Sequence, residues 1–215
     1  MAFLNSLHSA IAERAATESD ERQCIEKIMR ALQVEQPSAS PQPGWLPVCD
    51  LIDEAVSNVT LNVAEKNTGQ ATASSSSLVD HAQALLALSP QLAWWHRTAD
   101  VVPGSAMATG HANAMVIGSR GLEQSNDVSV GISLIAPDIQ YPEHHHPPEE
   151  VYLVLSKGHW QKGGGTWFEP GIGGLVHNPP NIMHAMRSGS TPLLCLLYTS
   201  PSPRDQRGSR MPSSA

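Results

Sequence analysis

Residues 141–152 read Tyr-Pro-Glu-His-His-His-Pro-Pro-Glu-Glu-Val-Tyr, and this stretch decides how the chain is interpreted. Side chains alternate along a β-strand with a period of two, so His144 and His146 are expected on one face and His145 on the other. Glu150 follows on an apolar strand, after a proline bend. Imidazole nitrogens and carboxylate oxygens are ligands of divalent metals. The stretch therefore predicts a site for a single metal ion.

A second part of this site is expected downstream, in residues 173–184, which read GGLVHNPPNIMH. Glycine and proline predict a tight turn there, and His184 follows on the next strand. A single histidine is more often a surface residue or a buried residue with a structural role. The combination of spacings is what predicts metal binding, with His144, His146, Glu150 and His184 as the ligand set.

Composition limits the classes of function that fit this chain. Its 215 residues are enough for one domain with a substantial core, and a net charge of -7 argues against general nucleic-acid binding. The 3 cysteines are scattered, which fits a reducing compartment better than a disulfide framework. No apolar run is long enough to cross a membrane, and the N-terminal residues do not resemble a signal peptide. The expected location is the cytoplasm.

Residues 1–100 have helical patterning. Apolar residues at helical spacing predict helices over residues 7–15 and 24–32, then over 50–61 with Asp50 as the N-terminal cap. A polar linker is expected over residues 67–77. A further helix is expected over residues 78–97, with a break at Pro90 because proline lacks the backbone N–H that a helix interior needs.

Residues 101–197 have strand-like patterning, with short apolar runs separated by glycine, proline and asparagine. Many short strands at this spacing favour a small antiparallel barrel or jelly roll. The predicted fold class is therefore mainly β with α, a β-barrel preceded by an N-terminal helical extension. The expected strands are 114–118, 128–135, 151–156, 166–168 and 193–197.

Residues 198–215 differ from the rest of the chain. They are rich in serine, proline and arginine and show no apolar periodicity, which is typical of a disordered segment. They also resemble translated adaptor sequence and follow a credible strand abruptly. The expectation is a non-native or disordered tail that begins at Tyr198.

The histidine-rich stretch resembles the first motif of the cupin superfamily, H-x-H followed by glutamate, and residues 173–184 resemble the second, with Asn181 where glycine usually stands. A more specific similarity is to the Q-type dimethylsulfoniopropionate (DMSP) lyases of this superfamily. It rests on YPEHHHPPEEVYLVLS, HNPPNIMHAM, LAWWHR and the helical extension, and it covers about residues 1–197. The resemblance implies a cupin barrel and cleavage of DMSP into dimethyl sulfide and acrylate.

The resemblance also implies roles for individual residues. His146, Glu150 and His184 would bind the metal, and Tyr152 would lie beside it. His144 and Tyr141 would line the substrate pocket, with His144 as a further candidate ligand. Iron and zinc are the leading candidates for the metal, although imidazole and carboxylate ligands do not choose among divalent ions.

The chemistry of DMSP adds two expectations. Its cleavage is a β-elimination, in which a base removes the proton next to the carboxylate while dimethyl sulfide leaves. Tyr152 and Tyr141 are the candidate bases, because a divalent cation nearby favours the phenolate form of tyrosine. The sulfonium group should prefer an aromatic face, as quaternary ammonium groups do. The candidates are Trp94, Trp95, Trp160 and Trp167, and Trp95 is the one selected as a substrate-binding residue.

Two other functions fit the same residues. A cupin dioxygenase acting on a thiol or small organic acid would show much the same ligand set. A non-catalytic cupin that binds a small molecule, or that holds a metal for stability alone, would also share it. In each case the partner is a small molecule, with no nucleic acid and no membrane, and a homodimer is expected only by analogy with other cupins.

Overall fold

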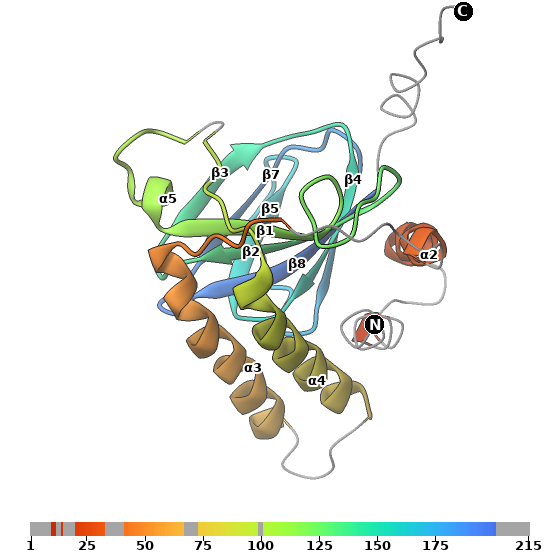
Figure 1. The fold of residues 1–215 in the computed structure, drawn as a ribbon, viewed down its shortest axis with the longest axis horizontal. Coiled ribbons are helices and arrows are strands. Elements are labelled where there is room, and N and C mark those ends of the chain that lie inside the picture. The colour runs from red at the N-terminus through yellow and green to blue at the C-terminus, as the bar shows by residue number, and fades with distance from the viewer. Residues whose placement is uncertain are drawn as a thin grey trace, which may run out of the picture.

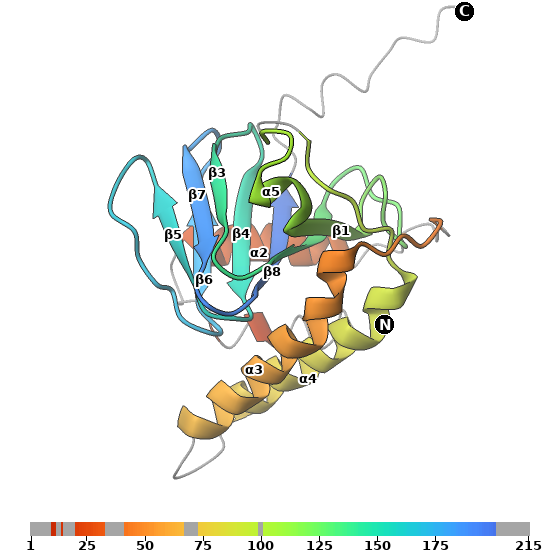
Figure 2. The same cartoon turned by 90° about the vertical axis from the view of Figure 1, so that its left-hand side faces the viewer.

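The structure is a computed structural model that describes residues 10–11, 14, 20–32, 41–66, 73–98 and 101–200. Two antiparallel sheets face each other, and helices from the N-terminal half pack on the outside of the larger one (Figures 1 and 2). This is the small barrel, or jelly roll, with an N-terminal helical extension that the sequence predicts. Among the described helices, none is both long enough and apolar enough to span a membrane.

The larger sheet has five strands in the order β1-β2-β8-β4-β6. Their alternation places one set of side chains on the helices and the other set on the barrel interior. On β4, for example, Val151 and Leu153 belong to the core shared with the helices, whereas Tyr152 belongs to a second core inside the barrel. The strands are β1 (His111–Ile117), β2 (Ser129–Ile135), β4 (Glu149–Val154), β6 (Leu175–Asn178) and β8 (Leu193–Ser200).

The smaller sheet has three strands in the order β3-β7-β5. The list of expected strands contains none of these three, nor β6 of the larger sheet, although a strand carrying His184 was expected after the turn. The strands are β3 (Gln140–His144), β5 (Gly158–Lys162) and β7 (His184–Ser188). The strand expected at residues 166–168 is wrong. Only Phe168 pairs there, in an isolated bridge to Trp160 of β5.

The helices flank the larger sheet. Helices α3 (Ile52–Lys66) and α4 (Ala73–Leu88) pack side by side as a hairpin, and α2 (Asp20–Leu32) contacts β4, β6 and β8 (Figures 1 and 2). Three shorter helices complete the described set: η1 (Pro47–Leu51), η2 (Ser89–Gln91) and α5 (Ala106–Thr109).

Several helix boundaries differ from the sequence prediction. Helix α4 begins at Ala73, inside the expected linker, and ends at Leu88 rather than near Arg97. Pro90 lies in η2, where its missing N–H is tolerated, and the chain beyond it is extended. Asp50 does not cap α3. It lies within η1, where its carboxylate accepts a hydrogen bond from the indole of Trp45 at 2.8 Å.

The extended segment 93–98, which we call the strap, runs along the edge of the larger sheet. Trp95 and Asn113 of β1 exchange both of their backbone hydrogen bonds, each at 2.9 Å. The backbone N–H of Trp94 also donates to the carbonyl of Gly44 at 3.1 Å. Successive side chains on the strap therefore point in opposite directions, with Trp94 in the core under the helices and Trp95 at the cavity described below.

The two ends of the chain are described only in part. Most of the helix expected at residues 7–15 lies outside the described residues, although Ile11 is buried. At the other end, β8 continues through Tyr198 and Thr199, which pair with β2 and β4. The barrel thus includes the first residues of the expected tail, because their backbone completes the central ladder. Residues 201–215 lie outside the described part.

Candidate metal centre and active site

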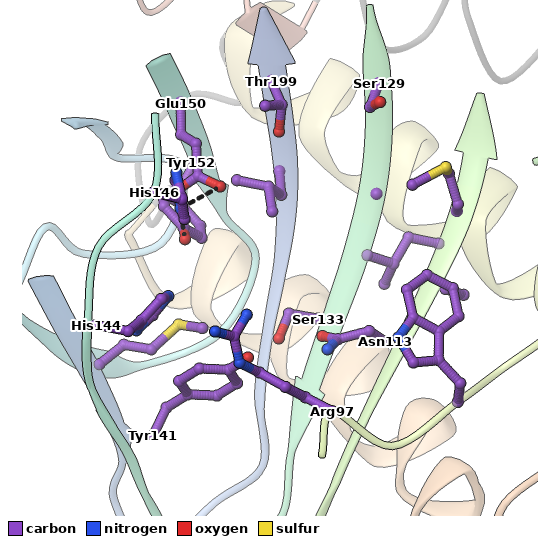
Figure 3. Close-up of a pocket in the computed structure, with 17 residues that line it drawn as sticks. Arg97, Asn113, Ser129, Ser133, Tyr141, His144, His146, Glu150, Tyr152 and Thr199 are labelled. Atoms are coloured by element: carbon purple, nitrogen blue, oxygen red, sulfur yellow. Dashed lines mark hydrogen bonds and ion pairs between the residues drawn. The ribbon is translucent and has the colours of Figure 1, made fainter. Parts of the chain in front are cut away.

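The candidate site lies inside the barrel, where the two sheets face each other (Figure 3). The smaller sheet supplies His144 at the end of β3 and His184 at the start of β7, which pair directly. His146 lies just beyond β3, in the connection to β4. Glu150 and Tyr152, two residues apart on β4, come from the opposite sheet. The predicted ligands are therefore brought together from three segments.

Three histidines form a compact group. The ligand atoms of His144, His146 and His184 all lie within 4.8 Å of one another, so this group could hold a metal ion. The ring centroids of His144 and His184 are 4.2 Å apart, and those of His146 and His184 are 5.0 Å apart. His145 is exposed and lies outside the group, as the alternation predicts.

Each of these imidazoles is oriented by a backbone carbonyl. The Nδ1 atoms of His144, His146 and His184 lie 2.9, 3.2 and 2.9 Å from carbonyl oxygens of residues two positions away. A carbonyl can only accept, so each Nδ1 carries the proton and donates it. The lone pair is then left on Nε2 in all three rings. This is the arrangement by which proteins fix the tautomer of metal-binding histidines.

Glu150 lies against the Nε2 side of this group. One carboxylate oxygen is 2.9 Å from Nε2 of His146 and the other is 3.5 Å from Nε2 of His184. Both Nε2 atoms are buried and have no hydrogen-bond partner of standard geometry among the described residues. A carboxylate oxygen and an imidazole lone pair are both acceptors, so close contact between them needs a positive charge in between. A divalent cation meets that need, and the donor set fits one.

Two of the three histidines have a pKa that is shifted toward the neutral form. Burial lowers the pKa of His144 to about 4, with a further contribution from His184, so its ring is neutral near pH 7. Burial lowers the pKa of His184 as well. For His146, the effect of burial is outweighed by the hydrogen bond and charge of Glu150, and its pKa is raised. Neutral imidazoles are the form that binds metals.

A cavity of about 210 Å³ opens next to this group. Its walls include the three site residues His144, His146 and Glu150, together with small polar side chains on the inner face of the larger sheet. The latter are Asn113, Ser129, Ser133 and Thr199 (Figure 3). A cavity of this size accepts only a small molecule.

The two tyrosines at the cavity have different hydrogen-bond partners. The hydroxyl of Tyr152 donates to Glu150 at 3.0 Å, and burial together with the charge of Glu150 raises its pKa well above 10. Burial also raises the pKa of Tyr141, but Arg97 and Asn113 oppose that change by charge and hydrogen bonding. Tyr152 is thus coupled to the ligand group, and Tyr141 to a cation from the strap.

Trp95 lines the cavity as predicted, but it lies on the strap and not on a helix. The guanidinium of Arg120 stacks on its ring, 5.5 Å from the centroid. A cation therefore already contacts this indole, which is the kind of contact expected for a sulfonium group.

Sequence reasoning did not assign a role to Arg97 or Asn113, both of which line the cavity. Arg97 is the last residue of LAWWHR, where helical spacing predicted the end of a helix. Asn113 directly precedes the strand expected at residues 114–118. Their proximity depends on pairing between the strap and β1, and no local pattern signals that pairing.

Comparison with known proteins identifies the family of the chain. The sequence model of the dimethylsulfoniopropionate lyase family matches residues 20–195, which is most of the chain and includes every predicted ligand. The chain belongs to the DMSP lyase family. A protein of Cereibacter sphaeroides provisionally named dimethylsulfoniopropionate lyase DddL is 28% identical over 104 residues. That match spans 48% of this chain and 44% of the DddL protein, so less than half of the relative is covered.

Solved structures of DMSP lyases have the same fold. The DddQ enzyme of Ruegeria pomeroyi DSS-3 matches with a TM-score of 0.58 and 18% identity, over 93% of this chain and 91% of that one. A chain from the crystal structures of the DMSP lyases RdDddP and RnDddQII matches with a TM-score of 0.60 and 20% identity, over 84% and 93%. At such identities the likeness establishes the fold alone, a cupin barrel with helices in its N-terminal part.

Proposed function

We propose that this chain is a metal-dependent lyase that cleaves DMSP by β-elimination into dimethyl sulfide and acrylate. The observation that carries the proposal is the group of three histidines, two of which face Glu150 through Nε2, beside a small cavity that two tyrosines also line. Membership of the DMSP lyase family supports the identity of the substrate.

The metal ligands in this proposal are His146, Glu150, His184 and His144. Their nitrogens and carboxylate suit iron or zinc, the two ions we favour. When bound, a divalent cation supplies positive charge that neutralises the substrate carboxylate and favours the phenolate form of a nearby tyrosine.

We assign the base to Tyr152. Its hydroxyl already points at Glu150, at the ligand group, so its oxygen lies where the substrate carboxylate would approach. Tyrosine oxygen removes the proton next to the carboxylate, the electrons form the new carbon–carbon double bond, and the sulfur leaves with the electrons of its bond to carbon. Tyr141 lines the substrate pocket beside His144, and the two ring centroids are 5.0 Å apart.

Part of the cavity wall belongs to the apolar interior core of the barrel. Tyr152 and Met186 are members of that core and line the cavity. Apolar neighbours strengthen electrostatic interactions at that wall, because they lower the local dielectric constant. The sulfonium group of the substrate would lie toward Trp95 in this arrangement.

The test is to incubate the purified chain with DMSP under anaerobic conditions and to measure dimethyl sulfide in the gas phase and acrylate in solution. We expect the two products in equal amounts. A dioxygenase would instead consume oxygen and release neither product without it. If DMSP yields no dimethyl sulfide while a thiol substrate consumes oxygen, the lyase proposal fails.

A further inference from the structure

The strap, which precedes the barrel strands in the sequence, places the positively charged side chain of Arg97 in the active-site cavity. Backbone pairing between Trp95 and Asn113 attaches the strap to the edge strand β1. Arg97 is two residues further along, and in an extended chain residues two apart point to the same side. Its side chain therefore follows that of Trp95 to the cavity, and both residues line it.

The backbone of Arg97 is held by a buried histidine at the start of β1. His111 is fully buried, and its Nδ1 lies 2.6 Å from the carbonyl oxygen of Met107, to which it donates. Its Nε2 accepts a hydrogen bond from the backbone N–H of Arg97 at 2.6 Å. Both ring nitrogens of His111 are thus used within the protein, and they fix the point from which the Arg97 side chain starts.

The guanidinium of Arg97 lies over the ring of Tyr141, 5.9 Å from the centroid. Figure 3 shows the side chain crossing the cavity from the strap toward Tyr141 and His144. Among the described residues that line the cavity, Arg97 is the only lysine or arginine. Ser129 and Thr199 line another part of the cavity, where Thr199 pairs with Glu150 (Figure 3).

DMSP has a negative carboxylate at one end and a positive sulfonium at the other. Guanidinium groups bind carboxylates through paired, charge-assisted hydrogen bonds, and they repel cations. A single arginine beside the metal ligands therefore makes the electrostatic potential more positive at one end of the cavity than at the other. The carboxylate is attracted to the guanidinium of Arg97, beside Tyr141, and the sulfonium is driven away from that guanidinium, toward Trp95 as in the proposed function.

We propose that Arg97 binds the substrate carboxylate alongside the metal and thereby sets the direction in which the zwitterion enters the site. Arg97 is then a specificity-determining residue that selects small carboxylates over neutral analogues of the same shape. For the identity of the substrate, this inference rests on the proposed lyase function.

The experiment compares binding of acrylate and of acrylamide, its neutral analogue, to the full metal-loaded chain by titration calorimetry. Arg97→Met should weaken acrylate binding by about tenfold to a hundredfold, the value of a charge-assisted hydrogen bond, and leave acrylamide unchanged. Arg97→Lys should weaken acrylate binding less than Arg97→Met does. Metal content should be unchanged in both variants, since Arg97 is not a ligand.

Arg120→Met is the matched control. Arg120 is exposed and stacks on Trp95, but it does not line the cavity, so its loss should leave acrylate binding unchanged. The inference is overturned if the wild-type chain binds no acrylate, if Arg97→Met binds it as tightly as the wild type, or if acrylate and acrylamide weaken together. Binding of acrylate that depends on Arg97, in a chain that does not cleave DMSP, would refute the lyase proposal and leave the carboxylate site standing.

Discussion

Glu150 is the residue on which the site depends most. Its two oxygens contact His146 and His184, and its carboxylate also accepts the hydroxyl of Tyr152. Such a buried acid surrounded by imidazole lone pairs is costly unless a cation joins them. The same residue thus connects the proposed metal ligands to the proposed base.

The first prediction concerns that base. Tyr152→Phe should lower kcat for DMSP cleavage by about a hundredfold to ten-thousandfold, the usual contribution of a general base, and should retain the metal. Tyr141→Phe should act mainly on KM, because Tyr141 lines the pocket. Initial rates of dimethyl sulfide release with metal analysis measure both. Undiminished turnover in Tyr152→Phe would remove it as the base.

The second prediction concerns the ligands. His184→Ala should weaken metal affinity by more than about a hundredfold, because even the loss of a residue that only supports a ligand costs tenfold to a hundredfold. Metal content per chain after dialysis is the measurement. His145→Ala is the control, since His145 is exposed and outside the group, and it should keep the wild-type content. Equal metal content in the two variants would exclude His184.

At the scale of single elements, the sequence predicted bounds for the apolar strands. It placed His144 and His184 on strands without bounds, and it missed β5 and β6. Strands β2, β4 and β8 are rich in valine, isoleucine and leucine, so their patterns are clear. Strands β3, β5 and β7 carry histidine, glutamate, glutamine, lysine and arginine, because two of them form the site. When polar residues face a cavity, the strand no longer alternates between apolar and polar residues, and strand prediction depends on that alternation.

The end of β8 gives an element-level prediction. Tyr198 is fully buried in the core shared with the helices, yet its hydroxyl has no hydrogen-bond partner among the described residues. Tyr198→Ala should therefore cost about 3 to 5 kcal/mol of unfolding free energy, as for other buried aromatics. Tyr198→Phe should be neutral or stabilising. Urea denaturation measures both. If Tyr198→Ala leaves the free energy of unfolding unchanged, Tyr198 belongs to the tail, as the sequence suggested.

Helix α4 gives a pH-dependent prediction. Burial, with a contribution from the charge of Arg14, lowers the pKa of His81 from 6.5 to about 4. The unfolded chain therefore takes up a proton that the folded chain excludes between these values. The contribution of His81 to the free energy of unfolding is therefore fully present above about pH 6.5. It decreases toward pH 4, by about 3 kcal/mol in total.

His81→Gln removes this titration, so its stability should fall less than that of the wild type between pH 7 and pH 4.5. Urea denaturation across that range is the measurement. His145→Gln is the control, because His145 is exposed, and its profile should match the wild type. Parallel profiles for His81→Gln and the wild type would show that His81 is not the titrating group.

At the scale of the whole molecule, the helical extension does more than cover the larger sheet. Its last segment, the strap, adds Trp95 and Arg97 to a cavity that the barrel otherwise builds. The predicted site residues Tyr141, His144 and His146 all lie at this cavity, because their spacing along one stretch determines their position. Trp95 was an expected substrate-binding residue, but the contribution of Arg97 could not be predicted, since it depends on tertiary pairing alone.

The central claim is that the histidine group and Glu150 hold the metal on which DMSP cleavage depends. The most direct test strips the purified chain of metal, adds back iron or zinc in steps, and records dimethyl sulfide release from DMSP under anaerobic conditions. We expect no release without metal and a rise that saturates at one ion per chain. Full release from the metal-free chain, or none at any metal content, would show that these residues do not hold a metal needed for the reaction.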